Sequence, residues 1–361
     1  MLYHLLYPLR EYLFVFNVFR YITFRAAYAM VTALIISFVF GPKIINWLKN
    51  LQIGERISED VPRTHSNKEG TPTMGGLLIL TSIILPTLLW ANLKNHYIQL
   101  ALIVTLWTGI LGFIDDYLSV VKRKDKGLVG RYKLLGQLSL GAALGIFLYL
   151  NPLVSEGITK TSVPFFKNVY IDWGIFYIPL VMLVITGTSN AVNLTDGLDG
   201  LATGVAAFSF FAFATLAYLS GHKVFAQYLN IIYLEGSGEL TVYCMSVVGA
   251  ALGFLWFNAH PAEIFMGDTG SLSLGGALGM VAVLLKRELL LIIIGGVFVA
   301  EALSVILQVA SFRLRGRRIF KMAPLHHHFE LRGWPESRVV VRFWIIAALL
   351  ALLSISTLKL R

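Results

Sequence analysis

The sequence is poor in charge and in cysteine. Only 14% of its 361 residues are charged, whereas 57% are hydrophobic. A soluble fold of this size cannot bury so much apolar surface, so lipid must cover part of it. The single cysteine, Cys244, excludes an intramolecular disulfide framework. Basic residues outnumber acidic ones, 30 to 20, but no basic helix carries interleaved aromatic residues, which argues against a nucleic-acid partner.

Apolar runs long enough to cross a bilayer recur from end to end of the chain. We therefore predict an all-α, polytopic integral membrane protein with about ten transmembrane helices, formed by residues 1–361 as one membrane-embedded domain. No small-residue cleavage site follows the first run, so we interpret it as a retained span. The predicted spans are 22–41, 74–91, 97–114, 133–150, 174–191, 200–220, 240–257, 271–285, 289–312 and 339–358.

The basic residues predict the orientation of these spans. The loops after spans 1, 3 and 9 hold five, six and seven Lys or Arg residues, if Lys133 is counted with its loop. The positive-inside rule places these loops in the cytoplasm, in contact with anionic membrane lipids, and both termini in the periplasm. Seven of the eight aspartates then fall on the cytoplasmic side, and only Asp172 does not. Acidic groups are thus expected to gather at one interface.

Two adjacent carboxylates, Asp115 and Asp116, end the third span. An unpaired charge at such a place is costly, so we expect a cationic group nearby. One carboxylate could hold Mg²⁺ while its neighbour acts as a base. The alternative interpretation is a solvated helix end that leads into a basic loop.

Two glycine-rich segments favour a polar ligand. In Asn190-Ala-Val-Asn-Leu-Thr-Asp-Gly-Leu-Asp-Gly200, two Asp-Gly pairs turn the backbone where oxygens and free amides can converge. In Gly267-Asp-Thr-Gly-Ser271, the glycines allow a close approach to phosphate at the start of a helix. Asp268 is the best candidate metal ligand there. A plain connecting turn and a helix cap are the structural alternatives.

Further polar residues fall in two basic loops. Residues 313–338 contain Pro324-Leu-His-His-His-Phe329, whose histidines are poorly placed to bind one zinc ion together but can donate to phosphate. Lys68 and Thr73 precede the second span, where helix punctuation is the alternative, and Lys133 could equally be a snorkelling residue. Glu301 lies deep in a span without an obvious partner; we expect it to be protonated and bonded to a neighbouring helix, or placed at a helix break.

Taken in order, Asp-Asp, Asn-Leu-Thr-Asp-Gly-Leu-Asp-Gly, Phe-Met-Gly-Asp-Thr-Gly-Ser and His-His-His resemble the polyprenyl-phosphate N-acetylhexosamine-1-phosphate transferase superfamily. Thr-Pro-Thr-Met-Gly-Gly and Met-Ala-Pro-Leu-His-His-His-Phe-Glu are similar to its phospho-MurNAc-pentapeptide transferase family, over essentially the whole chain. The resemblance implies Mg²⁺-dependent transfer from UDP-MurNAc-pentapeptide to undecaprenyl phosphate, which gives lipid I and UMP. It also implies a homodimer in the bacterial cytoplasmic (inner) membrane, with the active site facing the cytoplasm.

The resemblance also implies roles for individual residues. Asp268 would be the Mg²⁺ ligand, with Asp115 and Asp116 close to the ion and the lipid phosphate, and Asp116 would take a proton from that phosphate or orient it. Phe265 would stack on uracil. The positions expected around the nucleoside and its diphosphate are Asn193, Asp196, Gly197, Leu198, Asp199, Asn258 and Phe265. The other polar positions expected in the cleft are Lys68, Thr73, Lys133 and His326, of which His326 is also a catalytic candidate.

Two other functions remain open on sequence grounds. A sister enzyme that uses UDP-GlcNAc with the same lipid phosphate would need the same aspartates, although the Pro-Leu-His-His-His-Phe segment argues against it. A secondary transporter would also carry acids within the membrane and broken helices, but it would not need a phosphate cradle. We favour direct attack by the lipid phosphate over a covalent intermediate.

Overall fold

The computed structural model describes residues 1–51, 70–122, 127–151, 153, 159–166 and 169–359. Most of this part is helical, which confirms the prediction of an all-α polytopic membrane protein. Within the described residues, eight helical segments are long and apolar enough to cross a membrane. These segments are α2 (Ile22–Asn50), α4 with η4 (His96–Val121), α5 (Gly130–Leu150), α6 with η5 (Gly174–Thr195), α7 (Leu201–Gly221), α9 (Glu239–Asn258), α12 (Gly296–Arg315) and α14 (Glu336–Ser356).

The other two predicted spans are also helical but shorter. Helix α3 (Gly76–Trp90) has 15 residues and α10 (Gly267–Leu284) has 18. The predicted span 289–312 is broken, because α11 (Glu288–Ile294) ends at Gly295 before α12 begins. Glycine at the junction favours this break. A glycine has more backbone freedom than other residues, and it has no side chain to pack at the end of a helix.

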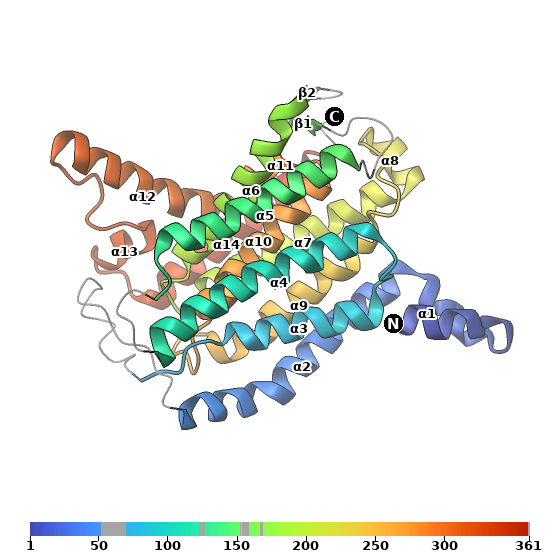
Figure 1. Ribbon diagram of the computed structural model, residues 1–361, viewed down its shortest axis with the longest axis horizontal. Helices are drawn as coiled ribbons and strands as arrows, with labels where there is room; N and C mark the ends of the chain where they lie inside the picture. Colours follow the sequence, from blue (N-terminus) through green and yellow to red (C-terminus); the bar gives the residue numbers. More distant parts are fainter. Residues whose placement is uncertain (52–69, 123–126, 152, 154–158, 167–168, 360–361) are drawn as a thin grey trace.

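The long helices run side by side in one bundle, from which α12 projects at one side (Figure 1). Helix α10 packs against α4 and α6, and every residue from Thr269 to Leu284 is buried. Small residues allow this close packing. A Cβ atom at Gly276 would lie 2.7 Å from the Thr108 methyl group, and one at Gly275 would lie 2.5 Å from the Thr188 carbonyl oxygen.

The two ends of the bundle differ. A short antiparallel hairpin of β1 (Lys160–Ser162) and β2 (Tyr170–Asp172) and helix α8 (Lys223–Leu229) lie at the end opposite α13 (Leu325–Glu330) (Figure 1). The N-terminal segment forms α1 (Leu2–Leu6), η1 (Tyr7–Glu11) and η2 (Phe14–Arg20), all without buried residues. The end that carries α13 is the one where the predicted polar motifs meet.

Candidate functional site

The end of α4 and the beginning of α10 are in direct contact because Gly112 has no side chain. A Cβ atom at this position would lie 2.2 Å from the main-chain oxygen of Asp268. Asp116, buried to 7% exposure, accepts hydrogen bonds from the backbone N–H groups of Asp268 and Thr269, both at 2.9 Å, and from the Thr269 hydroxyl at 2.5 Å. The carboxylate of Asp116 therefore caps the N-terminus of α10 from another helix, where the helix dipole favours negative charge.

A lysine joins the remaining two predicted carboxylates. The ammonium group of Lys133 on α5 lies 2.9 Å from Oδ2 of Asp115 and also donates to Oδ2 of Asp268. All three side chains are only partly buried. Lys133 is the cationic group that the paired aspartates required, and it neutralises carboxylates from two helices instead of snorkelling.

The carboxylate oxygens at this point fit a hard divalent cation. Mg²⁺ prefers oxygen ligands, and Asp115 and Asp268 offer them on either side of the lysine ammonium. The other oxygen of Asp268 accepts a hydrogen bond of 2.6 Å from the Asn193 side chain, which also donates to Ser271 at 2.9 Å. Asn193 thus fixes the orientation of the Asp268 carboxylate from α6.

The turn between α6 and α7 carries four of the predicted nucleotide contacts, Asp196, Gly197, Leu198 and Asp199. Gly200, the residue before α7, has a φ of +75° that favours glycine. Asn258, only 2% exposed, accepts from the Gly200 N–H at 3.1 Å and from the Thr203 hydroxyl at 3.3 Å, and it donates to the Ile264 carbonyl at 2.9 Å. The side chain of Asn258 therefore ties the turn to the loop before α10 from the inside.

The segment before α3 pairs with the loop before α10. Phe265 N–H donates to the Pro72 carbonyl at 2.8 Å, and the Phe265 carbonyl accepts from Gly75 N–H at 2.9 Å. This pairing brings the buried Thr73 beside the half-buried Phe265 at the mouth of the same site. Lys68 lies outside the described residues.

The three consecutive histidines have three different surroundings. Nδ1 of His326 faces Glu301 of α12 at 3.2 Å, whereas Nδ1 of His327 pairs with Glu330 at 2.7 Å. His328 accepts a hydrogen bond from the backbone of Lys321 at 3.0 Å. Burial, together with the positive charges of Arg332 and Lys321, lowers the pKa of the His328 imidazole, which favours its neutral form. Only His326 faces the turn after α6.

Sequence comparison identifies the family. The Glycosyl transferase family 4 profile matches residues 98–286, and the phospho-N-acetylmuramoyl-pentapeptide-transferase signature 1 matches residues 68–80. Curated proteins named phospho-N-acetylmuramoyl-pentapeptide-transferase, from Thermodesulfovibrio yellowstonii and Citrifermentans bemidjiense, are each 56% identical to the chain over the full length of both. One from Pelobacter propionicus is 54% identical over the full length of both. The chain belongs to the phospho-N-acetylmuramoyl-pentapeptide-transferase family.

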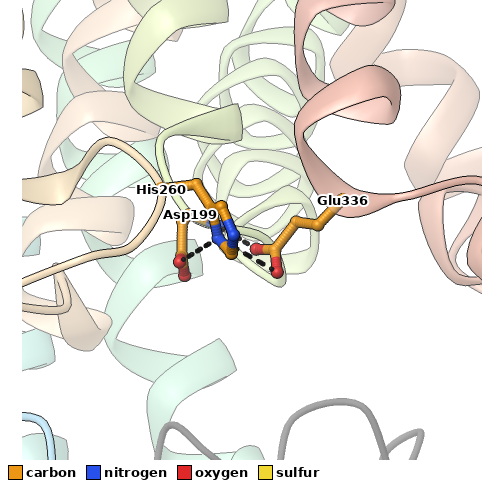
Figure 2. A group of neighbouring side chains, drawn as sticks. All are labelled: Asp199, His260 and Glu336. Carbon is orange, nitrogen blue, oxygen red and sulfur yellow. Dashed lines mark hydrogen bonds and ion pairs between the residues drawn. The ribbon is translucent and has the colours of Figure 1, made fainter.

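The structure adds to the site two residues that the sequence did not single out. His260 and Glu336 meet Asp199, and Figure 2 shows the three side chains pointing toward one another. Nδ1 of His260 lies 3.0 Å from Asp199 Oδ2 and 3.5 Å from Glu336 Oε2, and Glu336 also accepts from the Asp199 N–H at 2.8 Å. The start of α14 is thereby linked to the 196–199 turn.

This group also offers one metal-ligand atom from each side chain, all within 4.8 Å of one another. The hydrogen bonds explain the arrangement without an ion, because Asp199 Oδ2 accepts from both His260 and the Ala262 N–H. His260 and Glu336 come from segments far from Asp199 in the chain, and neither lies in a recognisable motif. Sequence spacing therefore gave no signal for them.

Proposed function

We propose that the chain transfers phospho-MurNAc-pentapeptide from UDP-MurNAc-pentapeptide to undecaprenyl phosphate, giving lipid I and UMP. The observation that carries the proposal is the identity of 54–56% to named transferases over the full length of both chains. The convergence of Asp115, Lys133, Asn193 and Asp268 at one end of the helix bundle supports it. The site faces the cytoplasm in this proposal, because the basic loop 313–338, which carries α13, lies at the same end.

The reaction joins two anions, so charge neutralisation and in-line positioning dominate its energetics. Asp268 and Asp115 would hold Mg²⁺. When bound, Mg²⁺ would neutralise the diphosphate and stabilise the departing UMP. Lys133, held between the two carboxylates, would add its positive charge to neutralise a phosphate group bound beside them.

Asp116 has a different position from Asp115. Three hydrogen bonds from α10 engage its carboxylate, so Asp116 fixes the helix that carries Asp268. Its Oδ1 atom accepts only one of these bonds, which leaves acceptor capacity to orient the lipid phosphate. We propose both roles for Asp116, with direct attack by the lipid phosphate.

The nucleotide would lie along the 196–199 turn. Phe265 is held next to Thr73 by backbone pairing, which supports the proposal that its ring stacks on uracil. Asn193 lies on α6, just before the turn. Asp199 ends the turn, next to Gly200, whose N–H donates to Asn258. Asn258 itself would act through the backbone that it holds, since both ends of its amide are already bonded to protein groups.

One reconstitution experiment separates the candidate functions. The purified chain is incubated with undecaprenyl phosphate, Mg²⁺ and either UDP-MurNAc-pentapeptide or UDP-GlcNAc, and UMP and the lipid product are measured. We expect product only with the pentapeptide nucleotide, and none after chelation of Mg²⁺ or in Asp268→Asn. Product from UDP-GlcNAc alone would assign the sister activity, and normal turnover of Asp268→Asn would remove Asp268 from the metal site. We also propose a homodimer, which native mass spectrometry of the same preparation tests.

A further inference from the structure

A carboxylate and an imidazole meet inside the protein next to the proposed nucleotide site. Glu301 of α12 and His326 of α13 both have 0% exposure. Oε2 of Glu301 lies 3.2 Å from Nδ1 of His326 and accepts a long hydrogen bond of 3.4 Å from the His326 backbone N–H. The buried acid that lacked a partner in the sequence is therefore paired with the first histidine of the triple run.

The opposite edge of the same ring faces the turn after α6. A Cβ atom at Gly197 would lie 2.3 Å from Nε2 of His326, so only glycine leaves room for the ring at this point. Nε2 and Nδ1 of the ring and Oε1 of Glu301 are all buried and have no hydrogen-bond partner among the residues that the structure describes, so Glu301 meets Nδ1 at ion-pair distance only. A buried polar atom without a partner is unfavourable, and a ligand group at Nε2 can supply the missing partner.

We propose that Glu301 is a positioning residue that orients His326, so that Nε2 of the ring meets the nucleoside diphosphate part of the substrate at the 196–199 turn. The inference rests on the proposed transferase function, which supplies that substrate. A carboxylate 3.2 Å from Nδ1 attracts this edge of the ring and so favours one ring orientation, as carboxylates do for other functional histidines. Glu301 itself reaches no reacting atom and acts only through His326.

The neighbouring histidine provides a matched control. Nδ1 of His327 pairs with Glu330 at 2.7 Å, and the three atoms nearest to a Cβ atom at Gly197 all belong to His326. The His327 ring packs edge-on against the His326 ring, with centroids 4.2 Å apart. Glu330→Gln therefore removes one carboxylate from an adjacent imidazole in the same short helix but leaves the carboxylate that faces His326 in place. We expect this variant to keep its kcat/KM.

Steady-state kinetics test whether Glu301 acts through His326. Glu301→Gln is expected to lower kcat/KM by about 10–100-fold, the range found when a carboxylate that orients a histidine is lost. His326→Gln is expected to lower it at least as much. The double variant should be no worse than His326→Gln alone, because residues that act as one unit are not additive. Losses that multiply in the double variant would overturn the proposal.

A second measurement does not depend on turnover. In protein labelled with ¹⁵N-histidine, the His326 ring signals are assigned by their loss in His326→Gln. Glu301→Gln should shift these signals, and Glu330→Gln should shift them less, because Glu330 reaches His326 only through the neighbouring His327 ring. If Glu301→Gln does not fold, Glu301→Asp keeps the carboxyl group on a shorter side chain and should move the same signals by a smaller amount.

The two measurements also separate this inference from the proposed function. A wild-type protein that transfers neither sugar would contradict the proposed function, while the ring signals would still show whether Glu301 orients His326. An active enzyme whose His326 signals and kcat/KM are unchanged in Glu301→Gln would instead overturn the positioning role alone. Gly197→Ala gives an independent check, because the added methyl group must displace the ring and should alter the His326 signals.

Discussion

The ammonium nitrogen of Lys133 lies 2.9 Å from Oδ2 of Asp115, and the same nitrogen contacts Asp268 on a third helix. One cation thus holds the ends of α4, α5 and α10 together. The same two carboxylates are the ones proposed to bind Mg²⁺. The ion must therefore compete with the lysine, which gives a direct way to detect its binding.

Lys133→Met should make the protein less stable in the absence of Mg²⁺. It should also increase the stabilisation that added Mg²⁺ provides. Without the ammonium group, the carboxylates of Asp115 and Asp268 repel each other, at a cost of about 1–2 kcal/mol for such a partly buried pair. Binding of a divalent ion should restore more stability in the variant than in the wild type. Thermal unfolding at increasing Mg²⁺ concentrations measures this. Lys160→Met in the hairpin is the control, and an equal Mg²⁺ response in all three proteins would contradict the prediction.

Asp116→Asn and Asp115→Asn should both lose activity, but they should differ in stability. Asp116 accepts three hydrogen bonds from the N-terminus of α10. In Asp116→Asn, the NH₂ group of the amide would face at least one of these donors, which costs about 1–3 kcal/mol of stability. Asp115 accepts only one backbone hydrogen bond, from the Leu128 N–H at 2.5 Å, so an amide in its place opposes fewer donors. Chemical denaturation of the two purified variants compares them. A less stable Asp115→Asn would show that the carboxylate cap is unimportant.

Gly112→Ala should separate α4 from α10 and so displace Asp268. The added Cβ atom would lie 2.2 Å from a main-chain oxygen, which cannot move without shifting the helix. We expect a loss of stability of about 1–3 kcal/mol, as in overpacked cores, and a fall in turnover of at least tenfold. Gly187→Ala in α6 is the matched control, because nothing lies within 4 Å of its Cβ position. Normal turnover of Gly112→Ala would mean that the helices tolerate a wider separation.

Glu239→Gln should destabilise the protein without changing the turnover of the folded fraction. Glu239 receives two hydrogen bonds from the buried Arg25, at 2.6 and 2.7 Å, and a third from the Asn92 N–H at 2.9 Å. Removing one partner of a buried ion pair costs about 3–5 kcal/mol. Thermal unfolding and activity per folded molecule are measured, with the exposed Glu235→Gln as the control, which should change stability by less than about 0.5 kcal/mol. A change in KM for the nucleotide would show coupling between this pair and the site.

Local sequence was enough to predict the helices and the motifs of the site. Hydropathy found a helix in every predicted span, because burial in lipid depends on the composition of each segment alone. The break at Gly295 was not predicted, since the apolar run continues through it. Asp115 and Asp268 stood out because acidic residues are rare beside apolar spans, and their closeness to Lys133 agrees with the expected need for a cation.

Contacts between distant segments could not be predicted. Asn258 was expected among the residues around the nucleotide, and nothing in the sequence indicated that its amide holds the turn from within the protein. Glu301 lacked a visible partner in the sequence because His326 follows it on another helix, across a loop whose path is not encoded in local periodicity. His260 and Glu336 had no motif of their own and became part of the site only through Asp199.

The sequence by itself determined the class of the protein, its spans, its family and the residue types available for chemistry, because these depend on composition, on order along the chain and on likeness to relatives. Only the tertiary structure decided which charges neutralise one another and which histidine faces the turn after α6. Those pairings depend on helix packing distances of a few ångströms, which glycines such as Gly112 and Gly197 set by the absence of a side chain.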